Sequence, residues 1–538
     1  METAQKFWNF ILHAKPSRVL LFIFSGIFIL RLPTLFVEYY DIDILTSFIH
    51  AADFFADRAT AINKGPAYHW ILNGSFWLFG QHPASFHLAG IIVIAMTAVG
   101  IFLMGRKLLS RQAGLLAALF YGFCISAFNR QFMAINAEII YNLFFVFSAY
   151  FFVLVCFEKK WWALFPLFLS LVLSVLSKFQ GLWIVLALLI YIFMVHPHFV
   201  LEKKAKKIYF RFFLSGLVFF LALFLFDWFF SGILVSSSLK NTLEGFYYYV
   251  AVRGFDPLFF LIKLTHRLAL MGFYHNVLWL AGVVTLWKFF TYREKTKEMG
   301  YLITLTLFLL FATFFAGQRL YFHYFVQVYP FLALLAGHTL VHWLKKERNR
   351  RLCFRFAAVP LVFLFVWNAK DAYFTRYSPE SFYQESKGMH YFRLVMLGQE
   401  NDYLLPHESY VKALDYIKSN TDEEERIFVW PEGAEFVYYA KRVSATTSFW
   451  YNVGALRCLQ FQSRGAVKEA QDCEAGQIKA VEKANPDYFI DVSLSPRSDL
   501  YPRGGLSANF KDFAAFLEKN YQRAGKFDAV TVWKRLKP

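Results

Sequence analysis

Two aspartates, Asp41 and Asp43, lie two residues apart at the start of a long polar connection between apolar segments. Carboxylates at the edge of a membrane are costly to leave without a partner, so the pair favours a catalytic or ion-binding role. A positioned carboxylate can accept the proton of a reacting hydroxyl, which contributes about 10²–10⁴-fold in rate. The competing interpretation is a solvated loop that begins at a helix end.

Further acids and bases stand in later connections between apolar segments. Lys178 alone fits a lysine that extends its side chain to the membrane interface. The loop from Arg319 to Tyr324 alone fits a basic and aromatic membrane anchor. The full set of candidate catalytic and anion-binding groups is Asp41, Asp43, Asp57, Lys64, Arg130, Glu138, Lys178, Arg319, His323 and Tyr324. Together they predict a polar cavity on the outer side of a membrane, able to accept an anionic, lipid-bearing substrate.

The composition is that of a polytopic membrane protein. The 538 residues are 57% hydrophobic and only 17% charged, whereas soluble chains are about 25% charged. The 67 Phe, 30 Tyr and 14 Trp exclude intrinsic disorder, and the 5 Cys are too few for a disulfide scaffold. The apolar runs are long and unbroken, so the spans are predicted to be helices rather than barrel strands.

Segments of about 20 apolar residues are long enough to cross a bilayer. We place about eleven such spans in the sequence, each with the length and hydropathy of a transmembrane helix. They fall at residues 20–36, 86–104, 112–128, 138–156, 161–176, 181–195, 209–230, 270–290, 301–317, 325–344 and 356–367.

The positive charge follows the predicted topology. Lys and Arg number 56 against 38 Asp and Glu, a formal net charge of +18. Among the connections between predicted spans, one alternate set holds far more cations than the other, near residues 6–18, 106–111, 159–160, 203–211, 288–297 and 345–355. Because positively charged loops stay in the cytoplasm, these connections and the N-terminus are predicted to be cytoplasmic. The excess charge therefore does not require a nucleic-acid partner.

A soluble domain is predicted to follow the spans. We divide the chain into a membrane domain at 1–369, with its first outer loop at about 37–85, and an extracytoplasmic α/β domain at 370–538. In the α/β domain helices are expected at 409–419 and 509–520, and strands at 426–430, 488–492 and 529–533. A further amphipathic helix is expected at 45–56, within the first outer loop. Cys458 and Cys473 share the α/β domain, and a disulfide and two free thiols fit the sequence equally well.

The order of these motifs resembles the GT-C glycosyltransferases of the protein O-mannosyltransferase and lipid A aminoarabinose transferase type, which belong to a group similar to glycosyltransferase family 39. The resemblance covers nearly the whole chain and depends on motif order rather than on any single motif. Its elements are the acidic pair at 41–43, Asp57 with Lys64-Gly65-Pro66, the stretch from Arg130 to Glu138, Leu176-Ser177-Lys178-Phe179-Gln180-Gly181, and Arg319 with His323-Tyr324 and the segment 329–337.

The resemblance implies a GT-C fold and the transfer of a sugar from a polyprenyl (undecaprenyl) phosphate carrier, with inversion expected. The acceptor would be lipid A, another cell-surface glycan or a protein, on the outer face of a bacterial inner membrane. Asp43 or Asp41 would be the general base, with Glu138 a further candidate catalytic carboxylate. Lys64, Lys178 and Arg319 would stabilise the phosphate, and the other candidate groups would bind substrate.

The sequence departs from the family pattern at two places, and both bear on the site. Ile44 follows Asp43 where many relatives have Glu, so it stays open which aspartate is the base. Gly65 replaces the first proline of a Lys-Pro-Pro motif. A polyprenyl phosphosugar is already activated, so no cofactor is required, and the sequence has no usable phosphate-cradling GxxxxGK motif. A divalent metal stays open, with Glu38, His69, His266, His275 and His323 as available ligands or as ordinary interface residues.

The competing functions are a multispan transporter or lipid flippase, and a membrane-anchored binding protein. Transporters keep ionisable residues near the bilayer midplane and show repeated, interrupted helices. Here Arg31 and Asp227 are the only charges well inside predicted spans, and both lie toward the outer ends. The sequence therefore favours an enzyme, with a lipid-linked donor, an envelope acceptor and membrane lipids as partners. It is expected to be monomeric, with a periplasmic C-terminal domain.

Overall fold

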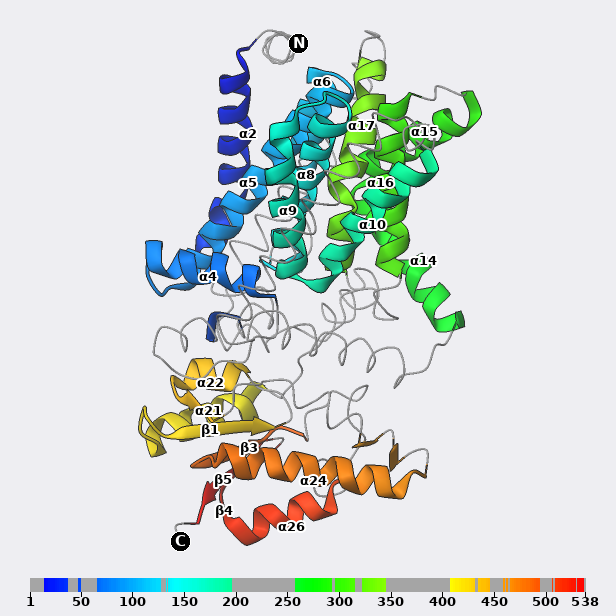
Figure 1. Cartoon of the computed structure of the whole chain (residues 1–538). Coiled ribbons are helices and arrows are strands. Elements are labelled where there is room, and N and C mark those ends of the chain that lie inside the picture. Colours follow the sequence, from blue (N-terminus) through cyan, green and yellow to red (C-terminus); the bar gives the residue numbers. More distant parts are fainter. Residues whose placement is uncertain are drawn as a thin grey trace. The chain divides into compact units, whose positions relative to one another are not determined.

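The computed structural model describes two compact units, drawn together in Figure 1. One lies within residues 1–40 and 62–374, and the other within residues 41–61 and 375–538. The described residues are 14–36, 47–49, 65–126, 132, 134–195, 257–292, 296–314, 322–344, 407–430, 434–445, 458–459, 461–462, 465–493, 506, 509–528 and 530–536. The predicted spans at 209–230 and 356–367 lie outside them, as does most of the helix predicted at 45–56.

The first unit is a bundle of helices (Figure 1). Two of them, α5 and α8, are by themselves long and apolar enough to cross a membrane. The helices are α2 (Pro16–Arg31), α4 (Pro66–Phe79), α5 (Pro83–Leu108), α6 (Arg111–Ile125), α8 (Ala137–Cys156), α9 (Leu164–Ser177), α10 (Leu182–Ile190), α14 (Pro257–Tyr274), α15 (Asn276–Tyr292), α16 (Lys297–Phe314) and α17 (Tyr329–Leu344). Shorter helical turns are η1 (Leu32–Phe36), η2 (Trp161–Ala163), η3 (Phe179–Gly181), η4 (Tyr191–Val195) and η6 (Phe322–Gln327).

Every predicted span that reaches the described residues overlaps a helix, with two corrections. The span predicted at 270–290 crosses a break, because α14 ends at Tyr274 and α15 begins at Asn276. Helix α4 lies inside the segment expected to be the first outer loop. It starts with a proline in its first turn and ends at Gly80, whose φ of +87° suits a helix terminus.

Helix α5 is the central element of the bundle, in contact with α2, α4, α6 and α8. The charge that the sequence placed inside the first span, Arg31, is buried at the end of α2. Its guanidinium donates to the carbonyls of Ile125 and Phe132, each at 2.6 Å, and to the Ser126 hydroxyl at 3.2 Å. These bonds satisfy a buried cation and fasten α2 to the end of α6.

The second unit is built on a five-stranded sheet of order β2-β1-β3-β5-β4. Strand β1 is parallel to β2 and β3, whereas β5 is antiparallel to β3 and β4, with a bulge between Arg523 and Gly525. The elements in chain order are α21 (His407–Asn420), β1 (Arg426–Trp430), α22 (Ala434–Ala440), β2 (Val443–Ser444), α24 (Val467–Ala484), β3 (Tyr488–Asp491), α26 (Lys511–Asn520), β4 (Tyr521–Phe527) and β5 (Val530–Arg535).

The sheet of the second unit has helices on both faces (Figure 1). Phe428 and Trp430 of β1 pack in one core with Phe513 of α26, while the alternating residues of β1 are buried on the other side of the sheet. Cys458 and Cys473, whose pairing the sequence left open, form a disulfide beside this core with 5.4 Å between their Cα atoms.

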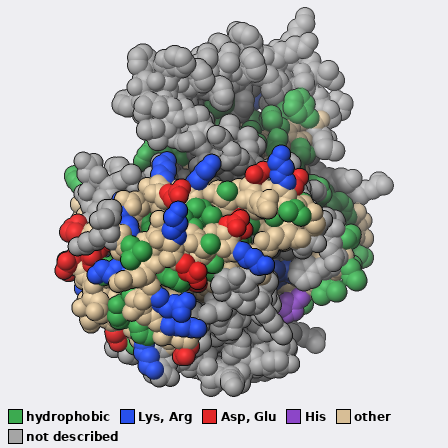
Figure 2. Space-filling view, turned by 90° about the horizontal axis from the view of Figure 1, so that it is seen from below, with side chains coloured by type: hydrophobic (Ala, Val, Ile, Leu, Met, Phe, Trp, Pro, Cys, Tyr) green, Lys and Arg blue, Asp and Glu red, His purple; other side chains and the backbone are tan. Residues whose placement is uncertain are grey.

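The described surface seen in Figure 2 carries both signs of charge. Lys and Arg side chains alternate there with Asp and Glu, and small apolar areas lie between them. Exposed residues of α24 illustrate the mixture, with Lys468 beside Glu469 and Glu482 beside Lys483. On this view the described part of the surface has the mixed charge of an ordinary solvated face.

Candidate active site

The first turn of α8 places a carboxylate inside the helical bundle. Glu138 follows Ala137, the first residue of the helix, and is only 2% exposed. A negative charge is favoured there because the unpaired amides of a helix N-terminus carry partial positive charge. One carboxylate oxygen of Glu138 forms an ion pair with the Lys178 ammonium. The same oxygen lies 3.8 Å from Nε2 of His323, which becomes a second cationic partner when protonated.

Lys178 owes its position to the abrupt end of α9. The helix stops at Ser177, and Lys178 continues in an extended conformation before the chain turns back through η3. The Gly181 amide donates to the Lys178 carbonyl at 2.7 Å. A Cβ at Gly181 would lie 2.2 Å from the Ser174 carbonyl oxygen, so this return requires glycine. The turn therefore holds the Lys178 backbone while its side chain reaches Glu138.

The start of α4 lies directly against the same turn. The amide of Gly65 donates to the Ser177 carbonyl at 3.2 Å, and a Cβ at Gly65 would come within 1.9 Å of the Leu176 carbonyl oxygen. The approach is thus closer than any larger residue allows. The position therefore needs a residue without a side chain and with a free backbone amide, which glycine supplies and proline does not.

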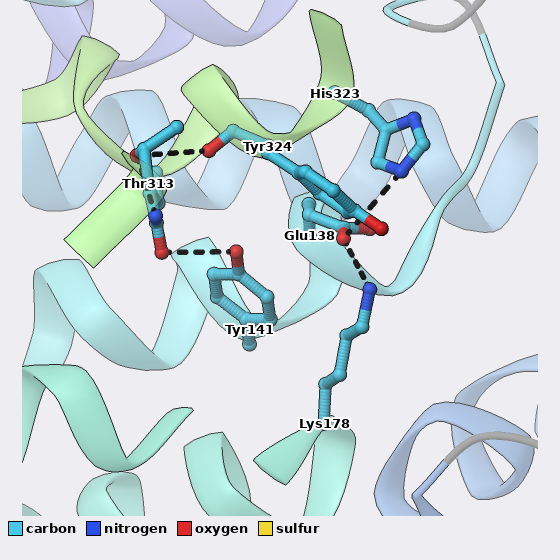
Figure 3. A network of polar contacts seen from close by, with 7 residues as sticks. Glu138, Tyr141, Lys178, Thr313, His323 and Tyr324 are labelled. Atoms are coloured by element: carbon cyan, nitrogen blue, oxygen red, sulfur yellow. Dashed lines mark hydrogen bonds and ion pairs between the residues drawn. The ribbon is translucent and has the colours of Figure 1, made fainter. Parts of the chain in front are cut away.

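The remaining two side chains come from η6, as Figure 3 shows. The rings of His323 and Tyr324 meet edge to face with centroids 4.5 Å apart. The Lys178 ammonium lies 5.2 Å from the centroid of the Tyr324 ring, within the range of a cation–π contact. Lys178 is thus held between a carboxylate and an aromatic face, while 28% of its side chain stays accessible.

The structure brings together four of the ten predicted site residues, which come from three separate elements of the chain. Glu138, Lys178, His323 and Tyr324 form one cluster, which we call the Lys178 cluster. Glu138 and His323 are buried in it, whereas Lys178 and Tyr324 are half-buried. The other six lie outside the described residues, namely the base candidates Asp41 and Asp43, the substrate-binding candidate Asp57, and the cations Lys64, Arg130 and Arg319.

Three neighbouring polar residues that sequence reasoning missed belong to the same region. Tyr141 donates to the side-chain carbonyl of Gln327 at 3.2 Å, and the Gln327 amide donates to the Thr313 hydroxyl at 2.7 Å. Tyr141 lies one turn after Glu138 on α8. The available signal was the polar residue inside an apolar span, which by default marks a functional region.

The opposite end of α8 carries cations that were predicted to be cytoplasmic. Glu158 accepts from Lys107 at 2.6 Å and from Lys160 at 2.7 Å, and these bonds hold the pKa of its carboxyl below the usual value. Helix α8 has 20 residues, so it separates this group from the Lys178 cluster by about 30 Å at 1.5 Å per residue. The two charged groups therefore occupy opposite ends of the bundle.

The histidines named as metal ligands do not converge within the described residues. His275 bonds to the Tyr329 hydroxyl at 2.6 Å, and His69 meets the Tyr68 ring edge to face. His266 lies on α14, and His323 belongs to the Lys178 cluster. In this part of the chain no three His, Cys, Asp or Glu side chains lie close enough to share a metal ion.

Comparison with known proteins supports the same family as the motif order. Residues 63–228 match the model of the dolichyl-phosphate-mannose-protein mannosyltransferase family. No curated protein sequence matches the chain. The fold is similar to that of ArnT from Cupriavidus metallidurans bound to undecaprenyl phosphate, with a TM-score of 0.59, 11% identity, and coverage of 97% of this chain and 99% of that one.

A second similar structure is the archaeal oligosaccharyltransferase AglB from Archaeoglobus fulgidus, solved with an inhibitory peptide and a dolichol-phosphate. It has a TM-score of 0.52 and 13% identity, and the match covers 91% of this chain and 70% of that one. The chain therefore has the GT-C fold, and the predicted resemblance to the protein O-mannosyltransferase and ArnT type is confirmed.

Proposed function

We propose that this chain is an integral membrane glycosyltransferase that takes a sugar from a polyprenyl phosphate carrier, with undecaprenyl phosphate the expected lipid. The observation that carries the proposal is the Lys178 cluster, a cation held ready in a mostly buried site at the end of α8 opposite the Glu158 group. The similar folds of ArnT and AglB were solved with undecaprenyl phosphate and dolichol-phosphate, respectively, which supports a donor of this class.

Lys178 is assigned to the donor phosphate. Its side chain is 28% accessible, whereas that of Glu138 is 2% accessible. Charge that develops on a leaving phosphate is strongly stabilised by a fixed cation in a water-poor site. Glu138 is almost fully buried and already paired, so we assign it to holding Lys178 rather than to accepting a proton from the acceptor. A phosphate oxygen would compete with Glu138 for the ammonium, and His323 would then be the remaining partner of the carboxylate.

The proposed reaction is a single displacement. The acceptor hydroxyl oxygen forms a bond to C1 of the sugar while the bond between C1 and the phosphate oxygen breaks. The hydroxyl proton passes to a carboxylate, for which Asp43 or Asp41 is proposed, and the polyprenyl phosphate leaves with the bonding electron pair. One displacement inverts the configuration at C1, and neither a nucleotide nor a redox cofactor enters the balance.

The acceptor is proposed to be lipid A, another cell-surface glycan or a protein on the outer face of a bacterial inner membrane. The Cys458–Cys473 disulfide supports an extracytoplasmic position for the C-terminal unit, because disulfides persist in oxidising compartments. The separation of the Lys178 cluster from the Glu158 group supports a site on the same outer side.

The test is mass spectrometry of lipids that copurify with the protein, followed by transfer assays with the donor so identified. We expect a polyprenyl phosphosugar on the wild-type protein and much less on Lys178→Met. Lys107→Met is the matched control, since it removes a lysine that is also paired with a glutamate but lies at the other end of α8. A wild-type protein that carries no such lipid and transfers no sugar would favour the transporter function instead.

A further inference from the structure

Helical turn η6 supplies half of the Lys178 cluster yet has little stability of its own. It is a 3-10 helix of six residues, Phe322–Gln327, and such helices have poor hydrogen-bond geometry and rarely extend beyond a few residues. His323 and Tyr324 occupy its second and third positions. Their distances to Glu138 and Lys178 therefore depend on whatever holds η6 from outside.

Two hydrogen bonds fasten η6 to α8, the helix that carries Glu138. Asn142 donates from Nδ2 to the Val326 carbonyl at 2.7 Å, and Tyr141 donates to Oε1 of Gln327 at 3.2 Å. Glu138, Tyr141 and Asn142 are spaced i, i+3 and i+4, so they share one face of α8. The face that presents the carboxylate is thus also the face that positions η6.

A third contact fastens η6 to α16. Nε2 of Gln327 donates to the Thr313 hydroxyl at 2.7 Å. The Thr313 hydroxyl has the Leu309 carbonyl at 2.8 Å and the Tyr324 carbonyl at 3.3 Å within reach of its single proton. Figure 3 shows Thr313 beside the backbone of Tyr324.

The Gln327 side chain takes part in both contacts, because it bonds to Tyr141 of α8 and to Thr313 of α16. It is 3% exposed, and its partners Tyr141 and Thr313 are 1% and 0% exposed, so bulk water does not replace a lost bond. An amide can accept from Tyr141 with its oxygen while it donates to Thr313 with its nitrogen. Leucine has a similar size but offers neither function.

We propose that Gln327 is a positioning residue of the active site, which holds η6 between α8 and α16 so that His323 and Tyr324 face the Glu138–Lys178 pair. Gln327 itself touches no reacting atom. The inference rests on the proposed function for its kinetic consequence, since η6 lies on the Lys178 side of the site and would act on the donor phosphate. Its structural part, the fastening of η6, stands independently of the substrate.

The structural readout is hydrogen–deuterium exchange of the full chain in detergent without substrate. Gln327→Leu and Thr313→Val are expected to raise exchange in the peptide that covers residues 322–328. Thr306→Val is the matched control, because the buried Thr306 hydroxyl bonds at 2.8 Å to Leu302 within its own helix and links no second element in the described part of the chain. Unchanged exchange in Gln327→Leu and Thr313→Val overturns the inference.

The kinetic readout separates positioning from general loss of structure. Gln327→Leu should raise the donor KM about tenfold, the scale expected from one or two lost buried hydrogen bonds, and leave the acceptor KM unchanged. A purely structural role would lower kcat alone, because fewer molecules are active, and that result overturns the inference. Gln327→Glu keeps the acceptor for Tyr141, so it should recover part of the donor KM.

The two proposals fail in different ways. Wild-type protein that transfers no sugar refutes the proposed function, and the exchange data alone then decide the position of η6. Wild-type activity with normal donor KM in Gln327→Leu refutes the role of Gln327 and leaves the proposed function intact.

Discussion

The backbone of Gly65 lies against that of Ser177, with 3.2 Å between the Gly65 nitrogen and the Ser177 oxygen. This hydrogen bond joins the residue after Lys64 to the residue before Lys178. Two basic motifs that are far apart in the sequence are therefore connected by one stretch of backbone contact. The first prediction tests whether that contact is needed.

Gly65→Ala should lower both thermal stability and sugar transfer. The new Cβ would lie 1.9 Å from the Leu176 carbonyl oxygen, and backbone cannot yield as a flexible side chain does. Gly74→Ala, on the same helix α4, is the control, since its Cβ meets no described residue within 4 Å. It should be neutral or stabilising by up to about 1 kcal/mol. Thermal unfolding in detergent measures both, and equal behaviour of the two variants would contradict the prediction.

Lys178→Met should reduce sugar transfer by about 10²–10³-fold, the loss expected when one fixed donor to a developing anion is removed. The substitution also leaves Glu138 buried, with His323 as its remaining ionic partner among the described residues. Breaking a buried ion pair in this way typically costs about 3–5 kcal/mol.

The double variant Glu138→Gln/Lys178→Met separates the two effects. It removes both charges, so it should recover much of the stability lost in Lys178→Met while transfer stays low. Unfolding midpoints and initial rates on the same preparations give the comparison. Recovery of activity together with stability would show that Lys178 acts only through folding.

Removal of the Cys458–Cys473 disulfide should destabilise the C-terminal unit. The bond closes a short loop, with a sequence separation of 15, for which the chain-entropy model gives about 3 kcal/mol. Pulse proteolysis of the full-length protein in urea would measure the loss in Cys458→Ser/Cys473→Ser. Maleimide labelling of the denatured wild type supplies the check, because five reactive thiols without reductant would refute the disulfide.

Asp491 gives the C-terminal unit a predicted pH dependence. Burial raises the pKa of its carboxyl to about 6, although the Ser493 amide donates to Oδ1 at 2.9 Å and opposes the rise. The folded state therefore favours the protonated form. Its contribution to stability is full below about pH 4, near the ordinary aspartate pKa, and is lost as the pH rises toward the folded pKa of about 6.

Asp491→Asn should abolish this dependence and stabilise the unit at pH 7, because the amide stays uncharged and keeps an oxygen for the Ser493 amide. The measurement is thermal unfolding at a series of pH values. Each sample is heated at its own pH, returned to one common pH and digested briefly with a protease, so that the extent of cleavage reports the unfolded fraction. Peptides from residues 407–536 report on the unit. If the wild type and Asp491→Asn lose stability in parallel between pH 4 and pH 7, another group is responsible.

The helices of the first unit could be predicted because a bilayer imposes a minimum length on any apolar span. Helix α4 escaped that reasoning because it has only 14 residues and contains Gly74. Its exposed Trp70 and Trp77 nevertheless fit an interfacial position, and Pro66 and Gly80 marked its ends. The sequence therefore contained the signals of a helix, but the whole segment 37–85 was interpreted as a loop because its first residues are polar.

The membership of the site could be predicted only in part. Charge and span order predicted that Glu138, Lys178 and His323 lie on the same side of the membrane. The contacts among these residues could not be predicted, because they depend on how α8, α9 and η6 pack. The spacing of residues along the sequence does not give the distance between two elements in space. Gln327 was missed for a related reason. A single glutamine in an apolar run does not indicate its hydrogen-bond partners, which here are Tyr141 and Thr313 on other helices.

The bulge in β4 bears on whether the sheet edge can pair with a strand of a second chain. Among the described strands β4 is an outer strand of its sheet, and the backbone groups of an outer strand can pair with a second chain. The register shift between Arg523 and Gly525 interrupts the regular spacing of those groups, and exposed Arg523 adds a charge that another copy would have to accommodate. Both features oppose the addition of a further strand, so β4 is a poor template for polymerisation of the C-terminal unit.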